Sequence, residues 1–173
     1  MQEEIRQGKP FANAEQEAFL NLQRTADALM RGLEETLKPT SLTQTQYNVL
    51  RILRGAGMQG LLCRQLSERM ITRDPDITRM LDRLEVRGFV TRSRDREDRR
   101  SITVRITAAG QRLVSELDAP IAELHRRQLS HLGGRNLGRL IMLLEGARKS
   151  SGTSPASGKI DRRPSGRKRG REV

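Results

Sequence analysis

The sequence predicts a mainly α-helical protein that carries one small antiparallel β-ribbon. Apolar residues recur at steps of three and four over most of residues 11–148, whereas a two-residue period occurs only between residues 90 and 106. Aromatic residues make up 2% of the chain, so Leu, Ile, Val, Met and Ala must form the core, and this mixture favours helices. The 173 residues suffice for one domain of ordinary size with appendages.

Two helices are expected in the first third of the chain. A long one-sided helix fits residues Phe11–Lys38, because Pro39 cannot continue it. Its apolar face consists of Phe19, Leu22, Ala26, Leu29, Leu33 and Leu37. The second helix begins where Thr43 can cap the first turn and Gln46 can bond back to the cap. It should end near Arg54 and bury Tyr47, Leu50 and Leu53.

A shorter helix and a longer one should follow a glycine-rich turn. The shorter helix fits residues Leu62–Met70, where leucines and methionines recur at four-residue spacing. The segment Asp74–Asp76 then supplies a capping carboxylate, a proline suited to the first helical position and an acid for the first turn. The sequence therefore predicts a helix over Pro75–Arg87, which Gly88 ends in the usual glycine role.

The β-ribbon is expected directly after this helix. Residues Ile102–Ile106 alternate between apolar and polar side chains, as in a half-buried strand, and Val90–Arg94 should pair with them. The connection Asp95–Arg100 is wholly charged, which is typical of a solvent-exposed hairpin tip.

Two helices and a basic tail complete the chain. Thr107 can cap a helix that is bent at Pro120 and ends before Gly133, and a last helix follows. Their apolar residues are Leu113, Leu117, Ile121 and Leu124 in the first, and Leu137, Leu140, Ile141 and Leu144 in the second. Ser, Gly, Pro, Lys and Arg dominate residues 149–173, so this segment should be disordered because it cannot bury enough apolar surface.

The net charge of +12 indicates a polyanionic partner, most commonly nucleic acid. Residues 149–173 hold eight cations and two acids, so half of the charge belongs to the tail and half to residues 1–148. No apolar run is long enough to span a membrane, and the segment MQEEIRQGKP lacks the apolar stretch of a signal peptide. A cytoplasmic protein without membrane association is therefore expected.

Few residues suggest chemistry. Cys63 is the only cysteine, so an internal disulfide is excluded, and its apolar neighbours favour a buried inert thiol over a redox sensor. His125 and His131 do not share a helical face, so a metal site is not expected. No activated nucleophile or glycine-rich phosphate loop is evident, and the sequence therefore predicts neither an enzyme nor a cofactor.

The order of helix, turn, helix and β-ribbon is that of a winged helix-turn-helix. Helical spacing places Arg79 and Arg83 on the outer face of the 75–87 helix, with Thr78 at its border. Seven arginines and no lysine lie between Arg87 and Arg105. Guanidinium groups can read guanine in the major groove and enter narrow minor grooves, so double-stranded DNA is the expected partner.

Other interpretations remain open on these residues alone. Arg79 and Arg83 could instead pair with Asp82 and Glu85, or with Asp76, on a solvated helix face. The alternative function is a winged-helix protein-interaction module that engages an acidic partner. RNA binding is disfavoured, because the recognition of single strands usually requires exposed aromatic residues.

Residues Leu42–Gly110 resemble the MarR family of bacterial regulators. The resemblance is carried by LTQTQYNVLRIL, ITRMLDRLEVRGFVTR and DREDRRSITVRITAAG, which cover both helices of the reading motif and the wing. It implies that the 75–87 helix enters the major groove and that an arginine of the wing enters the minor groove. The DNA-binding residues expected on this basis are Pro75, Asp76, Thr78, Arg79, Arg83, Arg96, Arg99 and Arg100, with Arg99 as the inserted arginine.

The resemblance also implies a homodimeric regulator. Residues 11–40 and 111–148 would form the helical dimerisation layer, residues 41–110 the DNA-binding domain, and residues 149–173 the disordered basic tail. A two-fold dimer would prefer an inverted-repeat operator. The family further implies repression that is relieved by a small aromatic or phenolic effector in a crevice between the two regions.

Overall fold

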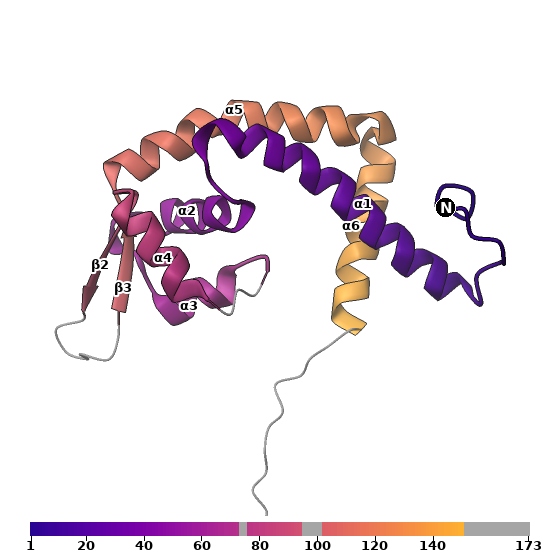
Figure 1. The fold of residues 1–173 in the computed structure, drawn as a ribbon, viewed down its shortest axis with the longest axis horizontal. Coiled ribbons are helices and arrows are strands. Elements are labelled where there is room, and N and C mark those ends of the chain that lie inside the picture. Colours follow the sequence, from indigo (N-terminus) through magenta and orange to yellow (C-terminus); the bar gives the residue numbers. More distant parts are fainter. Residues whose placement is uncertain (73–75, 95–101, 151–173) are drawn as a thin grey trace, which may run out of the picture. The chain divides into compact units, whose positions relative to one another are not determined.

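The computed structural model describes residues 1–72, 76–94 and 102–150 (Figure 1). It confirms the predicted fold class, since helices dominate and the strands form one small antiparallel sheet. The helices are α1 (Ala14–Leu37), α2 (Gln44–Ala56), α3 (Cys63–Arg69), α4 (Ile77–Val86), α5 (Ala108–Leu129) and α6 (Gly133–Ser150), and the strands are β1 (Leu61–Leu62), β2 (Val90–Arg94) and β3 (Ile102–Ile106). The chain divides into two compact units, Met1–His131 and Leu132–Val173.

The helix starts follow from local hydrogen bonds. The Thr43 hydroxyl accepts from the Gln46 amide at 3.2 Å, and the Gln46 side-chain oxygen accepts from the Thr43 amide at 3.1 Å. This reciprocal pair confirms the predicted capping box of α2. Thr107 caps α5 as expected, by accepting from Gly110 N at 3.1 Å. Helix α1 begins at Ala14, later than the apolar spacing alone suggests, because the Asn13 side chain caps it.

Helix α4 begins later than predicted. Its first residue is Ile77, and Asp76 occupies the N-cap position with a non-helical backbone, so Asp76 is not an acid of the first turn. The Asp76 side chain makes no capping hydrogen bond and instead lies 3.4 Å from the Arg79 guanidinium. The first helical hydrogen bond runs from Met80 N to Asp76 O. Pro75, which was expected at the first helical position, lies outside the described residues.

The sheet has three strands rather than the two that were expected. Its order is β1-β3-β2, with both neighbouring pairs antiparallel, and β2 and β3 match the predicted ribbon. Strand β1 takes Leu62 away from the predicted third helix, because Leu61 pairs with Val104 and Leu62 with Thr103. Only glycine at position 60 allows this pairing. Its φ is +70°, and a Cβ there would lie 2.4 Å from the Val104 carbonyl oxygen.

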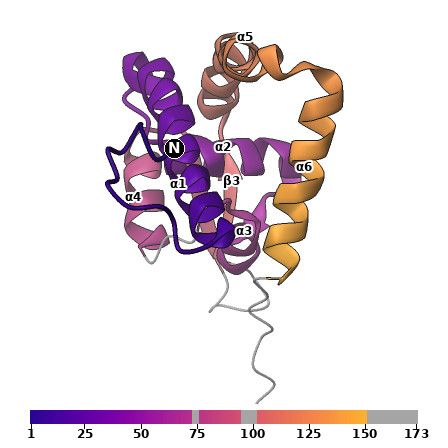
Figure 2. The same cartoon turned by 90° about the vertical axis from the view of Figure 1, so that its right-hand side faces the viewer.

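The hydrophobic core lies in the first unit and centres on α2. Helix α2 lies between α5 on one side and α3 on the other (Figures 1 and 2). The fully buried side chains are Leu37, Val49, Leu50, Leu53, Leu66, Leu81, Leu84, Val90, Val104 and Val114. The N-terminal part of α1 contributes little, because Phe19 is 60% exposed and Leu22 47%. The core thus holds α4 and the sheet in place and leaves only the N-terminal part of the apolar face of α1 uncovered.

Candidate nucleic-acid interface

Helix α4 has one buried face and one exposed polar face. Met80, Leu81 and Leu84 are buried, and Ile77 packs against the same core from a half-buried position. Thr78, Arg79 and Arg83 are exposed on the opposite side, as the helical spacing predicts. The core therefore anchors α4 through its apolar face and leaves its two-arginine face accessible to a ligand.

The two arginines on the exposed face of α4 differ in their surroundings. Arg79 forms an ion pair with Asp76 at 3.4 Å, as the solvated-face interpretation expected, although both side chains are more than half exposed. Such exposed pairs are typically worth at most about 1 kcal/mol, so the pair does not prevent Arg79 from binding another anion. Arg83 has no side-chain partner among the described residues. Arg83 is consequently the more available cation of the two.

Several arginines that follow α4 serve the fold. The Arg87 guanidinium donates to Thr40 O at 2.7 Å and to Ser41 O at 2.9 Å, and it lies over the Phe89 ring at 4.8 Å. Arg87 thereby ties the end of α4 to the connection between α1 and α2.

Arg105 on β3 is engaged in a similar way. It donates to Ser93 Oγ at 2.7 Å and to Met58 O at 3.3 Å. The first contact joins β3 to β2, and the second reaches the turn between α2 and β1. Counting arginines along the sequence therefore overstates the number that are available to bind an anion.

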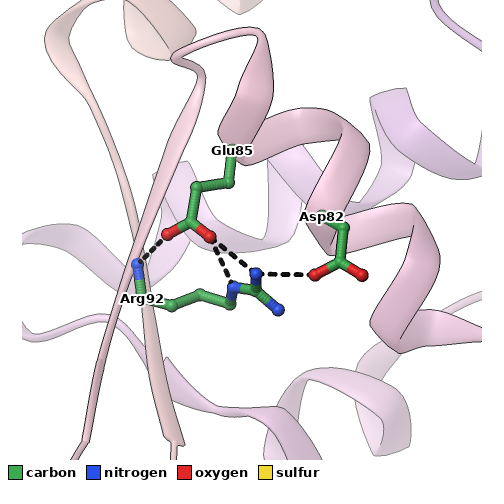
Figure 3. A network of polar contacts seen from close by, with 3 residues as sticks. All are labelled: Asp82, Glu85 and Arg92. Atoms are coloured by element: carbon green, nitrogen blue, oxygen red, sulfur yellow. Dashed lines mark hydrogen bonds and ion pairs between the residues drawn. The ribbon is translucent and has the colours of Figure 1, made fainter.

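Arg92 on β2 is the most extensively bonded of these arginines (Figure 3). Its guanidinium contacts both Asp82 and Glu85, which belong to α4, and its side chain is 23% exposed. The hydrogen bonds from Arg92 hold the pKa of the Glu85 carboxyl below its ordinary value. The two carboxylates that might have paired with Arg79 and Arg83 are thus occupied by Arg92 instead.

The charged connection of the ribbon falls outside the described residues. Arg96, Arg99 and Arg100, which the sequence places in the wing, belong to it. Among the described ribbon residues, Arg94 at the end of β2 is exposed and has no side-chain partner. Sequence reasoning did not single out Arg94. The sequence signal that could have identified Arg94 is its position as the last residue of the predicted strand, directly before the charged connection.

A cleft of about 230 Å³ lies within the first unit, between α1, α2, α5 and the segment that follows α3. Its walls combine apolar side chains such as Leu33 and Ile121 with the polar groups of Asn48, Arg51 and His125. The Arg51 guanidinium lies over the Tyr47 ring at 5.8 Å, and burial raises the pKa of the Tyr47 hydroxyl. The sequence indicates no role for His125, whereas the structure places it in this wall.

The Asn48 side chain connects the cleft to the segment that leads towards α4. Its oxygen accepts a hydrogen bond from Ile71 N at 3.2 Å. Ile71 and Thr72 also line the cleft, and they precede Asp76, the N-cap residue of α4, by only four or five positions in the sequence. A molecule bound in the cleft would therefore contact the chain only a few residues before α4.

The remaining chemical candidates have unremarkable surroundings. Cys63 is half-buried rather than fully buried, and burial is the main reason that the pKa of its thiol is raised. Among residues 1–72, 76–94 and 102–150, no group of His, Cys, Asp or Glu could hold a metal ion. In the same part of the chain, no helix is long and apolar enough to cross a membrane.

The three-stranded sheet, the helix-turn-helix and the polar face of α4 together define the winged-helix class of proteins. The family model of the MarR family matches residues 42–102. A MarR transcription factor from Planctomyces limnophilus is 41% identical in sequence, and the match covers 79% of this chain and 98% of the other, with a TM-score of 0.62. This chain belongs to the MarR family of transcriptional regulators.

Two further solved structures share the fold at lower identity. A MarR variant of E. coli in complex with operator DNA is 24% identical, with a TM-score of 0.72 over 80% of this chain and 99% of the other. The Bordetella bronchiseptica protein BpsR, whose DNA binding is regulated by 6-hydroxynicotinic acid, is 23% identical, with a TM-score of 0.71 over 81% and 98%. Members of the MarR family are transcription factors rather than enzymes.

Proposed function

We propose that this protein is a sequence-specific regulator that binds double-stranded DNA. The main support for the proposal is the exposed face of α4, where Arg83 has no side-chain partner among the described residues while the opposite face is fixed in the core. Thr78 and Arg79 lie on the same face and would contact bases and phosphates of the major groove. Family membership supports this assignment, because the E. coli relative was solved with operator DNA.

The wing would supply a second contact. We assign the minor-groove role to Arg99, with Arg96 and Arg100 at the adjacent backbone, on the basis of the family resemblance. Arg94 would add a phosphate contact at the described end of β2, since its side chain is exposed and has no acidic partner in the part of the chain that the structure describes. Of the remaining sequence candidates, Pro75 and Asp76 would set the start of α4 rather than read bases.

The active species would be a homodimer on an inverted-repeat operator. Each compact unit by itself exposes large apolar side chains on a helix of the proposed dimerisation layer, residues 11–40 and 111–148. Phe19, Leu22 and Met30 are 41–60% exposed on α1, and Ile141, Met142 and Leu143 are 55–72% exposed on α6. Contiguous apolar surface of this kind marks protein interfaces, and a second copy of the chain would cover it.

The cleft beside α2 would receive a small effector that relieves repression. Its apolar walls suit an aromatic ring, and Arg51 supplies a positive charge for an acidic or phenolic group. The Asn48–Ile71 hydrogen bond connects a residue of the cleft wall to the segment that precedes α4 in the chain. An effector that binds more tightly to a displaced position of this segment would lower the affinity for DNA.

Selection from a random duplex pool at physiological salt tests the proposed function directly. An inverted repeat should be recovered, and Arg83→Ala should weaken binding to it by about 5- to 100-fold, the usual range for a lost base contact. Arg112→Ala is the matched control, because Arg112 is an exposed arginine of α5 that lies outside α4 and the ribbon. Failure to recover an inverted repeat, or equal effects of the two substitutions, would refute the proposal.

A further inference from the structure

Arg92 joins β2 to α4 through a cluster of three charged side chains (Figure 3). Its Nε and Nη2 atoms donate to Glu85 Oε2 at 2.8 and 2.6 Å, and Nη2 also lies 2.6 Å from Asp82 Oδ1. The Arg92 backbone amide donates to Glu85 Oε1 at 2.9 Å. Glu85 therefore bonds both the backbone amide and the guanidinium of Arg92. These bonds hold the strand and the charged group in place together.

This cluster lies between the two elements that the proposed function assigns to DNA. Helix α4 carries Arg79 and Arg83, while the ribbon carries Arg94 on the same strand as Arg92. Backbone hydrogen bonds from Gly88 N to Glu85 O and from Phe89 N to Leu84 O form the turn between α4 and β2. Beyond this turn, the polar contacts that join the two elements within the described residues are those of Arg92. The shared core around Leu84 and Val90 packs α4 against the sheet, and the bonds of Arg92 add directional contacts between α4 and the exposed side of the ribbon.

We infer that Arg92 is a positioning residue for DNA recognition, which holds the β2–β3 ribbon against α4 so that both can engage one operator half-site. The inference rests on the proposed function, since it concerns how the same interface reads DNA. Arg92 itself does not contact DNA in this arrangement. Two carboxylates take up its guanidinium, and 23% of its side chain remains exposed.

The proposal differs from a simple charge effect in the sign of one measurable result. If only net charge mattered, removing the carboxylate of Glu85 would strengthen binding to DNA, because phosphate repulsion would fall. If the cluster positions the ribbon, Glu85→Gln weakens binding to the selected operator even though the protein becomes more positive. A charged hydrogen bond is about twice as strong as a neutral one, so Gln at this position holds Arg92 less firmly.

The experiment compares variants on the selected inverted repeat and on a scrambled duplex of equal length. Arg92→Gln, Arg92→Lys and Glu85→Gln should each reduce the ratio of the two affinities by about five- to tenfold, which lies within the roughly 2- to 150-fold range of coupled contacts. Arg92→Lys keeps the charge but loses the planar fork, so it should resemble Arg92→Gln. The double variant Glu85→Gln with Arg92→Gln should be no worse than Arg92→Gln alone.

Matched controls separate positioning from charge. Glu116→Gln removes an exposed carboxylate of α5 that has no side-chain partner among the described residues, and it should leave the affinity ratio unchanged. Arg94→Gln should weaken binding to both duplexes similarly and should lower the salt dependence, as loss of a phosphate contact does. Circular dichroism and thermal unfolding verify that every variant is folded at the assay temperature.

The outcomes distinguish this inference from the proposed function. If the unmodified protein selects no duplex, the proposed function fails before Arg92 is tested. If it selects an inverted repeat and Glu85→Gln strengthens binding to both duplexes, or if Arg92→Lys retains the full affinity ratio, the positioning role is overturned while the proposed function stands. A reduced ratio in Arg92→Lys and Glu85→Gln, with Glu116→Gln unchanged, supports the positioning role.

Discussion

The Arg54 guanidinium binds both carboxylate oxygens of Asp118, at 2.7 and 2.8 Å, and so joins α2 of the helix-turn-helix to α5. The two residues are 64 positions apart in the sequence, and no periodicity suggests that they meet. The bidentate geometry is the strongest that an arginine and a carboxylate can form. Both side chains are nevertheless partly exposed, so solvent screens the pair.

This pair predicts a pH-dependent part of the stability. The hydrogen bond from Arg54 is the main cause that lowers the pKa of Asp118 below its ordinary value. Because the unfolded chain takes up this proton at higher pH than the folded protein does, the stabilisation is present above the ordinary pKa of Asp and is lost as pH falls through the lower folded pKa. Asp118→Asn should therefore be less stable than the unmodified protein at pH 7, and the difference should shrink as the pH falls below the ordinary Asp pKa of about 3.9. Urea unfolding across this range measures the difference, and one that stays constant with pH would contradict the assignment.

Two helical glycines should respond in opposite directions to alanine. A Cβ at Gly110 would lie 2.4 Å from Phe89 O and 2.8 Å from Ile106 Cγ1, whereas one at Gly55 would meet no atom within 4 Å. Gly110→Ala should cost about 1–3 kcal/mol, since the first turn of α5 must move away from the sheet. Gly55→Ala should stabilise by about 0.5–1 kcal/mol, because alanine has the better helix propensity. Chemical unfolding of the pair tests the packing, and equal effects would show that α5 is not held so closely.

The proposed homodimer predicts that a charge on its apolar surface lowers the molecular mass in solution. Phe19→Glu and Ile141→Glu place a carboxylate at positions that are 60% and 55% exposed in the single chain. Both variants should sediment largely as monomers at concentrations where the unmodified protein is dimeric. Val86→Glu is the control, because Val86 is 89% exposed but belongs to α4 rather than to the proposed dimerisation layer. A dimer that survives both changes would place the interface elsewhere.

The cleft predicts a response to small aromatic acids. Benzoate, used as a probe, should reduce binding to the selected operator when present at millimolar concentration. Arg51→Ala should abolish this response while leaving DNA affinity without benzoate nearly unchanged, since Arg51 lines the cleft and does not lie on α4. Fluorescence anisotropy of a labelled duplex measures both quantities. An equal benzoate response in the variant would separate the effect from this cleft.

Local sequence signals predicted most of the helices and the ribbon. The Thr43 capping box, the Thr107 cap and the alternation at Ile102–Ile106 involve residues that are close in sequence, so their pattern determines their structure directly. Strand β1 could not be predicted in this way. Two leucines carry no period, and they form a strand only because Val104 and Thr103 lie beside them in the folded chain.

In the candidate site, too, local sequence signals predict some features, whereas others depend on contacts that form only in the folded chain. The exposed position of Arg79 and Arg83 follows from helical spacing alone. The engagement of Arg87, Arg92 and Arg105 depends instead on tertiary partners, which a count of charges cannot reveal. The cleft, likewise, combines residues of α1, α2 and α5 that no motif groups together.

Strand β1 also helps to protect the sheet from pairing with another chain. A two-stranded hairpin has two open edges and is only marginally stable in water, whereas pairing with β1 covers part of the outer edge of β3. At the outer edge of β2 the Arg92 amide is already bonded to Glu85, and the exposed Arg94 adds a charge of the kind that discourages strand addition by another chain. Loss of the Glu85 carboxylate together with the Arg94 charge would therefore leave this edge more open to pairing with another chain.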